Sequence, residues 1–124
     1  MPDQQLALGG KGTDLFGGIP VADFQRSVAW YTRLFGAPPA FFPNDSEAVW
    51  MVAEHRWLYI IVDGKRAGGA VQTVMVDGLD DIITGIAERG LEYGDEERPA
   101  DSVRKVMYYD PDGNEIGIGS IPSD

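Results

Sequence analysis

The sequence contains no cysteine and only one histidine, His55, among its 124 residues. Without cysteine the chain can form neither a disulfide framework nor a thiolate nucleophile, and this agrees with a cytoplasmic location. His55 falls in a segment expected to be a turn, where a lone histidine is a weak candidate for a metal ligand or a catalytic base. The absence of cysteine therefore excludes thiol chemistry, and the single histidine gives little support to metal binding or catalysis by an imidazole.

Basic residues and long apolar runs are also scarce. Ten Lys and Arg stand against twenty Asp and Glu, which gives a net charge of −10. A nucleic-acid-binding protein needs a basic face, so we expect no nucleic-acid partner. No run of about 18 apolar residues and no signal-peptide pattern occurs, so we expect no membrane segment. The acidic balance serves solubility or attracts a cationic ligand.

Two stretches of the chain, residues 19–36 and 74–91, begin alike at an offset of 55 residues. Each starts with the alternating apolar pattern of a strand and continues with the three-and-four spacing of an amphipathic helix. Asp23 and Asp77 stand at or beside the expected helix N-caps, and each helix ends near a glycine. The chain therefore contains an internal repeat.

Strand patterns follow each of these helices, so each half reads β-α-β-β-β. We place module one at about residues 12–63, a linker at 64–69 and module two at about 70–121. Neither half can bury both faces of its sheet alone. The prediction is one α+β domain, in which two βαβββ modules form a curved mixed sheet around a cavity. The acidic run 94–101 is expected to be a solvated loop that would favour a cation if it borders the cavity.

The segment Asp-Pro-Asp-Gly-Asn at 110–114 predicts a turn that fixes the register of a hairpin. It pairs Tyr109 with Glu115 and Met107 with Gly117. One predicted face is mixed and hollow, and consists of Lys105, Met107, Tyr109, Glu115, Gly117 and Gly119. The opposite face, which a helix would cover, consists of Val106, Tyr108, Ile116 and Ile118.

An earlier hairpin is expected to turn near Glu54 and His55, which pairs Trp50 with Tyr59. It gives an aromatic face of Trp50, Trp57, Tyr59 and Ile61, although a one-residue slip would exchange the two faces. Large aromatic side chains opposite glycines predict a slot for a flat or extended apolar ligand. Alternatively, these aromatic residues fill the core or a dimer interface.

Three segments carry a resemblance to a known family: VADFQRSVAWYTRLFG, VDGLDDIITGIAERG and YYDPDGNEIG. With them, the chain from about Leu15 to Ile121 resembles the vicinal oxygen chelate superfamily, which includes glyoxalase I, extradiol dioxygenases, and fosfomycin- and bleomycin-resistance proteins. The resemblance implies paired βαβββ modules and a homodimer.

The resemblance also assigns metal-ligand positions to this chain. They fall on Phe16, Val71, Gly117 and a position between Tyr59 and Ile61, none of which offers an ionised or imidazole ligand. The implied protein holds no metal and no cofactor, as in the bleomycin-resistance branch. Glu115, two residues from Gly117 on the same face, is the one carboxylate that could enter the cavity, either as a metal ligand or as a polar contact to substrate.

Three functions follow from these observations. The first is a metal-free protein that sequesters an amphiphilic aromatic small molecule, with a cationic one favoured by the acidic charge. The second is a lyase, isomerase or dioxygenase, with Glu115 and Tyr109 as candidate acid or base. The third is a structural or regulatory domain with a filled cavity. The predicted ligand-binding residues are Phe16, Trp50, Trp57, Tyr59, Val71, Met107, Tyr109, Glu115 and Gly117.

Overall fold

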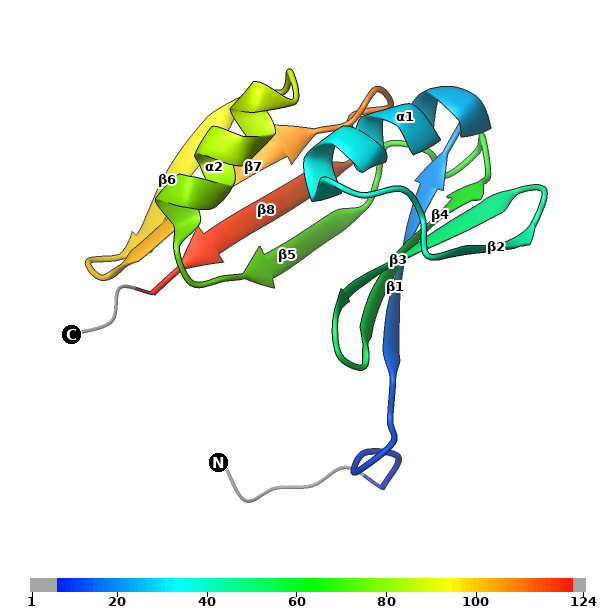
Figure 1. Ribbon diagram of the computed structural model, residues 1–124, viewed down its shortest axis with the longest axis horizontal. Coiled ribbons are helices and arrows are strands. Elements are labelled where there is room, and N and C mark those ends of the chain that lie inside the picture. Colours follow the sequence, from blue (N-terminus) through cyan, green and yellow to red (C-terminus); the bar gives the residue numbers. More distant parts are fainter. Residues whose placement is uncertain (1–6, 122–124) are drawn as a thin grey trace.

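The computed structural model describes residues 7–121, which form two βαβββ modules with both helices on the same side of the sheets (Figure 1). Module one consists of β1 (Leu15–Val21), α1 (Phe24–Phe35), β2 (Phe41–Asn44), β3 (Glu47–Ala53) and β4 (Arg56–Val62). Module two consists of β5 (Val71–Met75), α2 (Leu79–Glu88), β6 (Asp95–Ala100), β7 (Val103–Tyr109) and β8 (Glu115–Ser120). Neither helix within residues 7–121 has the length and apolar character needed to cross a membrane.

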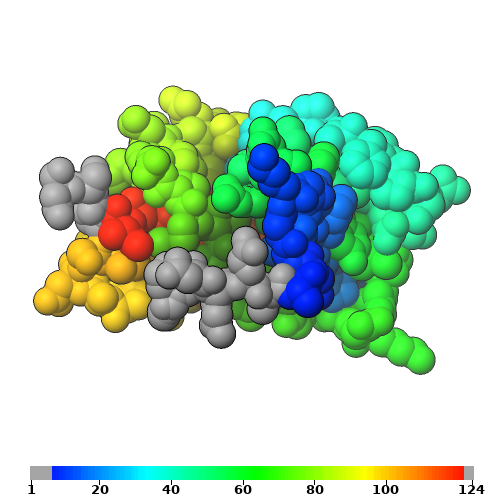
Figure 2. All heavy atoms as spheres, turned by 90° about the horizontal axis from the view of Figure 1, so that it is seen from below, coloured from blue at the N-terminus to red at the C-terminus, as the bar shows by residue number. Residues whose placement is uncertain are grey.

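Each module builds its own four-stranded mixed sheet. The strand orders are β1-β4-β3-β2 and β5-β8-β7-β6, so the two modules have the same topology. In each, the first strand pairs in parallel with the last, and the other neighbours are antiparallel. The predicted α+β fold of two βαβββ modules is confirmed. Figure 2, seen from below, shows module one on the right and module two on the left.

Helix α1 begins and ends as its sequence predicts. The Asp23 side chain accepts a hydrogen bond from the backbone N–H of Arg26 at 3.1 Å, which satisfies one free donor at the helix start. Gly36 ends the helix in the left-handed conformation, with φ 77°. Between these caps, Tyr31 and Leu34 are spaced to face the sheet and are buried, so α1 covers the core of module one.

Helix α2 differs at its start. Its N-cap is Gly78, with φ 69° and no side-chain capping bond, and Asp77 precedes the cap. Acidic residues in the first turn, Asp80 and Asp81, interact favourably with the helix dipole instead. At the other end, Arg89 Nη2 donates to the backbone oxygen of Leu34 at 3.1 Å. The C-terminal ends of α1 and α2 are therefore linked across the modules.

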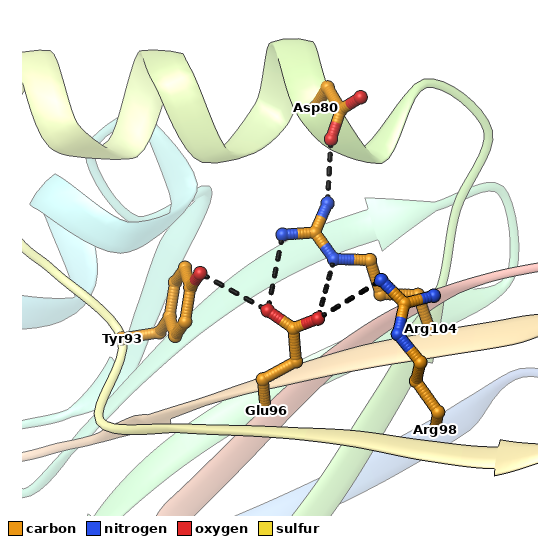
Figure 3. Close-up of polar contacts among 5 residues, drawn as sticks. All are labelled: Asp80, Tyr93, Glu96, Arg98 and Arg104. Carbon is orange, nitrogen blue, oxygen red and sulfur yellow. Dashed lines mark hydrogen bonds and ion pairs between the residues drawn. The ribbon is translucent and has the colours of Figure 1, made fainter.

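Most of the acidic run 94–101 forms strand β6 and not a solvated loop, although every residue of the strand is exposed. An ionic cluster holds it against α2 (Figure 3). Arg104 of β7 donates through Nη1 to Asp80 at 2.7 Å and through Nε to Glu96 at 3.1 Å. Tyr93 and Arg98 also contact Glu96. The hydrogen bond from Arg104 is the main reason that the pKa of Glu96 lies below its ordinary value. Charge pairing thus compensates for the few apolar contacts that this edge strand can make.

Candidate functional site

The turn at 110–114 has the predicted geometry, and it also joins the two modules. Tyr109 pairs with Glu115 and Met107 with Gly117, while Gly113 has φ 93°. The Asn114 side chain is fully buried. Its Nδ2 donates to the backbone oxygen of Pro20 on β1 at 2.8 Å. The face of module two that carries the predicted site residues is therefore fixed relative to β1.

The predicted pairing of β3 with β4 is wrong by one residue over most of its length. Trp50 pairs with Leu58, and Met51 pairs with Trp57. The expected turn is present, because Ala53 still pairs with Arg56, but a β-bulge between Met51 and Ala53 shifts every pair beyond it. The shift moves the side chains of β3 to the opposite face of the sheet.

Trp50 consequently lies under helix α1 and not on the predicted aromatic face. It is 3% exposed, its Nε1 donates to the backbone oxygen of Ala37 at 2.9 Å, and its ring lies 5.6 Å from that of Phe35. For this tryptophan the core alternative holds. It belongs to the hydrophobic core and is withdrawn from the candidate site.

Phe16, Phe41, Trp57 and Tyr59 form what we call the aromatic face, on the side of the first sheet away from α1. The rings of Phe16 and Trp57 stack at 5.3 Å with an interplanar angle of 4°. Tyr59 meets Phe16 edge-on at 6.4 Å, and Phe41 meets Trp57 at 5.9 Å. Phe16 and Phe41 remain 46% and 44% exposed. A hollow of about 350 Å³ is lined by Phe16, Phe41, Pro43, Glu47, Val49 and Tyr59.

Asp14 and His55 hold the Trp57 ring in place. Trp57 Nε1 donates to Asp14 Oδ2 at 2.7 Å, and His55 Nδ1 lies 2.8 Å from Asp14 Oδ1. The bond from Trp57, followed by that from His55, lowers the pKa of Asp14. His55 therefore has a defined partner, unlike the solvated turn histidine expected. No sequence pattern could have indicated this contact, because Asp14 lies 41 residues before His55.

The glycines of β8 do not leave an open face. A Cβ atom placed on Gly117 would lie 2.5 Å from Cε of Lys105 and 3.4 Å from its Nζ. A Cβ atom on Gly119 would lie 2.9 Å from Sδ of Met75. The missing side chains make room for long side chains from β7 and β5. The predicted face consists of the expected residues, but the side chains of Lys105 and Met75 fill the space beside its glycines.

The other predicted residues of module two lie on this same face. Met107 is buried at 3% exposure, whereas Val71 is 65% exposed and pairs with the half-buried Glu115. Tyr109 donates its hydroxyl to Asp95 at 2.6 Å. This hydrogen bond is the main cause that raises the pKa of Tyr109 to about 12. Tyr109 is thus held in its protonated form, which is unsuited to a base near neutral pH.

A cleft of about 590 Å³ lies between the edge strands β1 and β5. Gln72 crosses it, donating from Nε2 to the backbone oxygen of Gly18 at 3.2 Å. Trp57 of the aromatic face lines this cleft together with Thr73 and Met75 of module two. The cleft therefore brings one predicted aromatic residue next to side chains that border Gly117 and Gly119.

The residues at the four positions implied by the resemblance do not fit a divalent metal ion. Phe16, Tyr59, Val71 and Gly117 provide no carboxylate or imidazole, and the cationic side chain of Lys105 crosses Gly117. Within the described residues 7–121, no three His, Cys, Asp or Glu side chains gather as a metal site would require. The geometry instead provides an aromatic platform, an apolar cleft and a lysine.

Comparisons with known proteins agree with this fold. The family model described as Glyoxalase/Bleomycin resistance protein/Dioxygenase superfamily matches residues 14–118. The crystal structure of a glyoxalase/bleomycin resistance protein from Catenulispora acidiphila DSM 44928 is 47% identical, with a TM-score of 0.85, and the match covers 90% of this chain and 100% of that one. No curated protein sequence matches the chain.

Two more distant structures are similar in fold alone. A lactoylglutathione lyase from Agrobacterium tumefaciens has 14% identity and a TM-score of 0.71, with 90% of this chain and 95% of that chain covered. The fosfomycin resistance protein FosX from Listeria monocytogenes has 16% identity and a TM-score of 0.63, with 90% and 93% covered. Since the family model spans most of the sequence and a relative shares 47% of its residues, the chain belongs to the glyoxalase/bleomycin resistance protein/dioxygenase superfamily.

Proposed function

We propose that this protein binds a small amphiphilic molecule without a metal ion, and that the flat apolar part of the molecule packs on the aromatic face. The observation that carries the proposal is the stack of Phe16 on Trp57, with nearly half of Phe16 exposed. Aromatic pairs contribute about 0.5–1.5 kcal/mol beyond the burial of their area. A third ring added to this stack would gain contacts that solvent does not provide.

Contacts within the protein already orient the platform before any ligand arrives. Asp14 holds the Trp57 ring through its Nε1 atom, and the backbone of β1 and β4 fixes Phe16 beside it. Little side-chain entropy is therefore lost when a ligand packs against these rings, which favours binding. A surface apolar residue without such support would be a weaker anchor.

Charge indicates which ligands would approach most readily. The chain has a net charge of −10, and Glu47 lines the hollow of the aromatic face. A positively charged group on the exposed part of the ligand would be attracted by this field and by the faces of the rings. Flat cationic aromatic compounds, with bleomycin as one example, are therefore the first compounds to test. The proposal includes a cytoplasmic homodimer as the binding species.

The alternative is an enzyme of the same superfamily, a lyase, isomerase or dioxygenase acting on a small organic substrate. Its acid or base would be Glu115, since Tyr109 is occupied by Asp95. Glu115 is half-buried at the start of β8, opposite the exposed Val71. Any activity found should fall sharply in Glu115→Gln if this carboxylate transfers a proton, and an unchanged rate would exclude it.

Calorimetric titration of the purified protein with bleomycin and with simpler flat aromatic cations tests the binding proposal. Phe16→Ala should weaken binding by about tenfold, because it removes one ring of the stack. Phe42→Ala is the matched control, since Phe42 is 55% exposed but packs against Phe24, away from the aromatic face. No heat from any compound, or equal losses in the two variants, would overturn the proposal.

A further inference from the structure

We propose that Lys105 is the polar anchor of this ligand site and binds a carboxylate on the buried end of an aromatic ligand. This inference deepens the proposed function and rests on it. It concerns the face of module two that the sequence predicts to be hollow. That face carries a cationic side chain at the point where the resemblance implies a metal-binding carboxylate.

Lys105 lies opposite a carboxylate on the neighbouring strand but does not form an ion pair with it. Glu97 lies directly opposite it on β6, yet the lysine side chain turns the other way and runs across Gly117 of β8. Among the described residues, no carboxylate lies within ion-pairing distance of its ammonium group, although several form pairs with other cations. Lys105 is also only partly exposed. Its ammonium group therefore has no counter-charge from the described residues, and an anionic ligand group could pair with it.

A second donor converges on the same place. The Oγ1 atom of Thr73 and the Nζ atom of Lys105 each lie 3.4 Å from the point where a Cβ atom of Gly117 would stand. Cε of Lys105 occupies this point, so a ligand oxygen that lies beside it, between the two groups, could accept hydrogen bonds from both. A carboxylate suits the pair best, because a charge-assisted bond to an ammonium is shorter and stronger than a neutral one. Gly117 is needed for this arrangement, since a Cβ atom at this position would displace the Lys105 side chain.

The cleft between the sheet edges brings one residue of the aromatic face near Thr73, one of the two proposed donors. Trp57 and Thr73 line the same cleft of about 590 Å³, a volume within the range of small-molecule sites. A ligand whose ring packs near Trp57 could thus direct its carboxylate toward Thr73 and Lys105. A positive charge, where the ligand has one, would remain at the exposed acidic end. The ligand class is a flat aromatic carboxylate, including zwitterions.

Three probes of one shape separate the contribution of the carboxylate from that of the aromatic ring. They are 2-naphthylacetate, 2-naphthylacetamide and 2-naphthylethylamine, titrated into the purified protein. Wild-type protein should bind the carboxylate about tenfold or more tightly than the amide, as expected for a hydrogen bond to a charged group. Lys105→Met keeps the apolar stem and should remove this preference. Lys105→Arg should retain part of it. Lys65→Met, in the linker, is the control and should bind like wild type.

A chemical readout locates the anchor independently. Saturating 2-naphthylacetate should slow the acetylation of Lys105, measured by peptide mass spectrometry, and should leave Lys65 unprotected. Suppose that the probes bind and that Phe16→Ala weakens their binding. Equal affinity for carboxylate and amide, or a preference for the carboxylate that persists in Lys105→Met, would then overturn the Lys105 anchor alone. A Lys105-dependent preference that is insensitive to Phe16→Ala would support the anchor and contradict the aromatic face. Absence of binding by all three probes would refute both.

Discussion

The hydroxyl of Tyr31 on α1 donates a hydrogen bond of 2.7 Å to the Oδ2 atom of Asp110, which lies 79 residues later in the turn of module two. Both residues are buried. Asp110 Oδ1 accepts from the backbone N–H groups of Asp112 and Asn114 at 2.9 Å, so the carboxylate that shapes the turn also holds the helix of the other module. Burial, followed by the charge of Asp110, raises the pKa of Tyr31.

Tyr31→Phe should therefore destabilise the whole domain and not the turn alone. Removal of the hydroxyl leaves a buried carboxylate with one donor fewer, at a cost of about 1–3 kcal/mol. Urea unfolding followed by tryptophan fluorescence measures the change. Tyr109→Phe is the control and should cost less than Tyr31→Phe, because its hydroxyl bond to Asp95 lies at the surface. Equal stability of Tyr31→Phe and wild type would show that the contact between modules contributes nothing.

Two glycine substitutions should differ strongly in their effect on the free energy of unfolding. Gly117→Ala places its new methyl group against the flexible end of Lys105, which can move aside, so the free energy of unfolding should change by less than about 1 kcal/mol. Gly68→Ala would place Cβ 2.5 Å from the backbone oxygen of Asp112 at φ 94°, and neither constraint can relax cheaply. We expect a loss of about 2 kcal/mol or more, from backbone strain and steric overlap. Thermal unfolding of the two variants under one condition checks the order.

Gly117→Ala should nevertheless impair ligand recognition, since Lys105 must leave its place. Its preference for naphthylacetate over the amide should fall, even though the protein remains folded. A variant that is folded and retains the full preference would show that the position of Lys105 over Gly117 does not matter for the anchor.

The pKa of Tyr109 provides a test at high pH. Since the hydrogen bond to Asp95 raises this pKa from 10.0 to about 12, the contact contributes stability at pH values below 10. That contribution disappears as the pH rises through 12. Ultraviolet titration of tyrosinate should show one phenol ionising near pH 12 that moves toward 10 in Asp95→Asn. An unchanged titration curve in this variant would contradict the assignment.

Much of the fold could be predicted because its determinants are local. The offset of 55 residues and the alternating strands indicated both modules, and the Asp-Pro-Asp-Gly-Asn turn has one plausible register. The hairpin at Glu54 and His55 has no comparable turn sequence that would fix its register. Because a β-bulge follows Met51, Trp50 lies in the core and not on the predicted aromatic face. Nothing in the local sequence pattern indicates that bulge.

The site was harder to predict because its contacts are not local. A glycine pattern shows where a side chain is missing, but it does not show which neighbour fills the space. Lys105 lies over Gly117 only because it turns toward β8 and away from Glu97. Similarly, Asp14 reaches Trp57 across 43 residues of sequence. Pairings of this kind depend on the choice of side-chain rotamers in the folded protein.

The contact between Asp14 and Trp57 leads to a last prediction, at low pH. Hydrogen bonds from Trp57 and His55 hold the pKa of Asp14 below its ordinary value of 3.8, so the contact stabilises the fold above that pH. Its contribution is lost as the pH falls through the lower pKa of the folded state. The indole N–H resonance of Trp57 should therefore shift with a midpoint below pH 3.8, whereas that of Trp50, bonded to a backbone oxygen, should not follow this titration. In Asp14→Asn the Trp57 shift should vanish and naphthyl probes should bind less tightly. A Trp57 resonance that titrates identically in Asp14→Asn would mean that another group controls the ring.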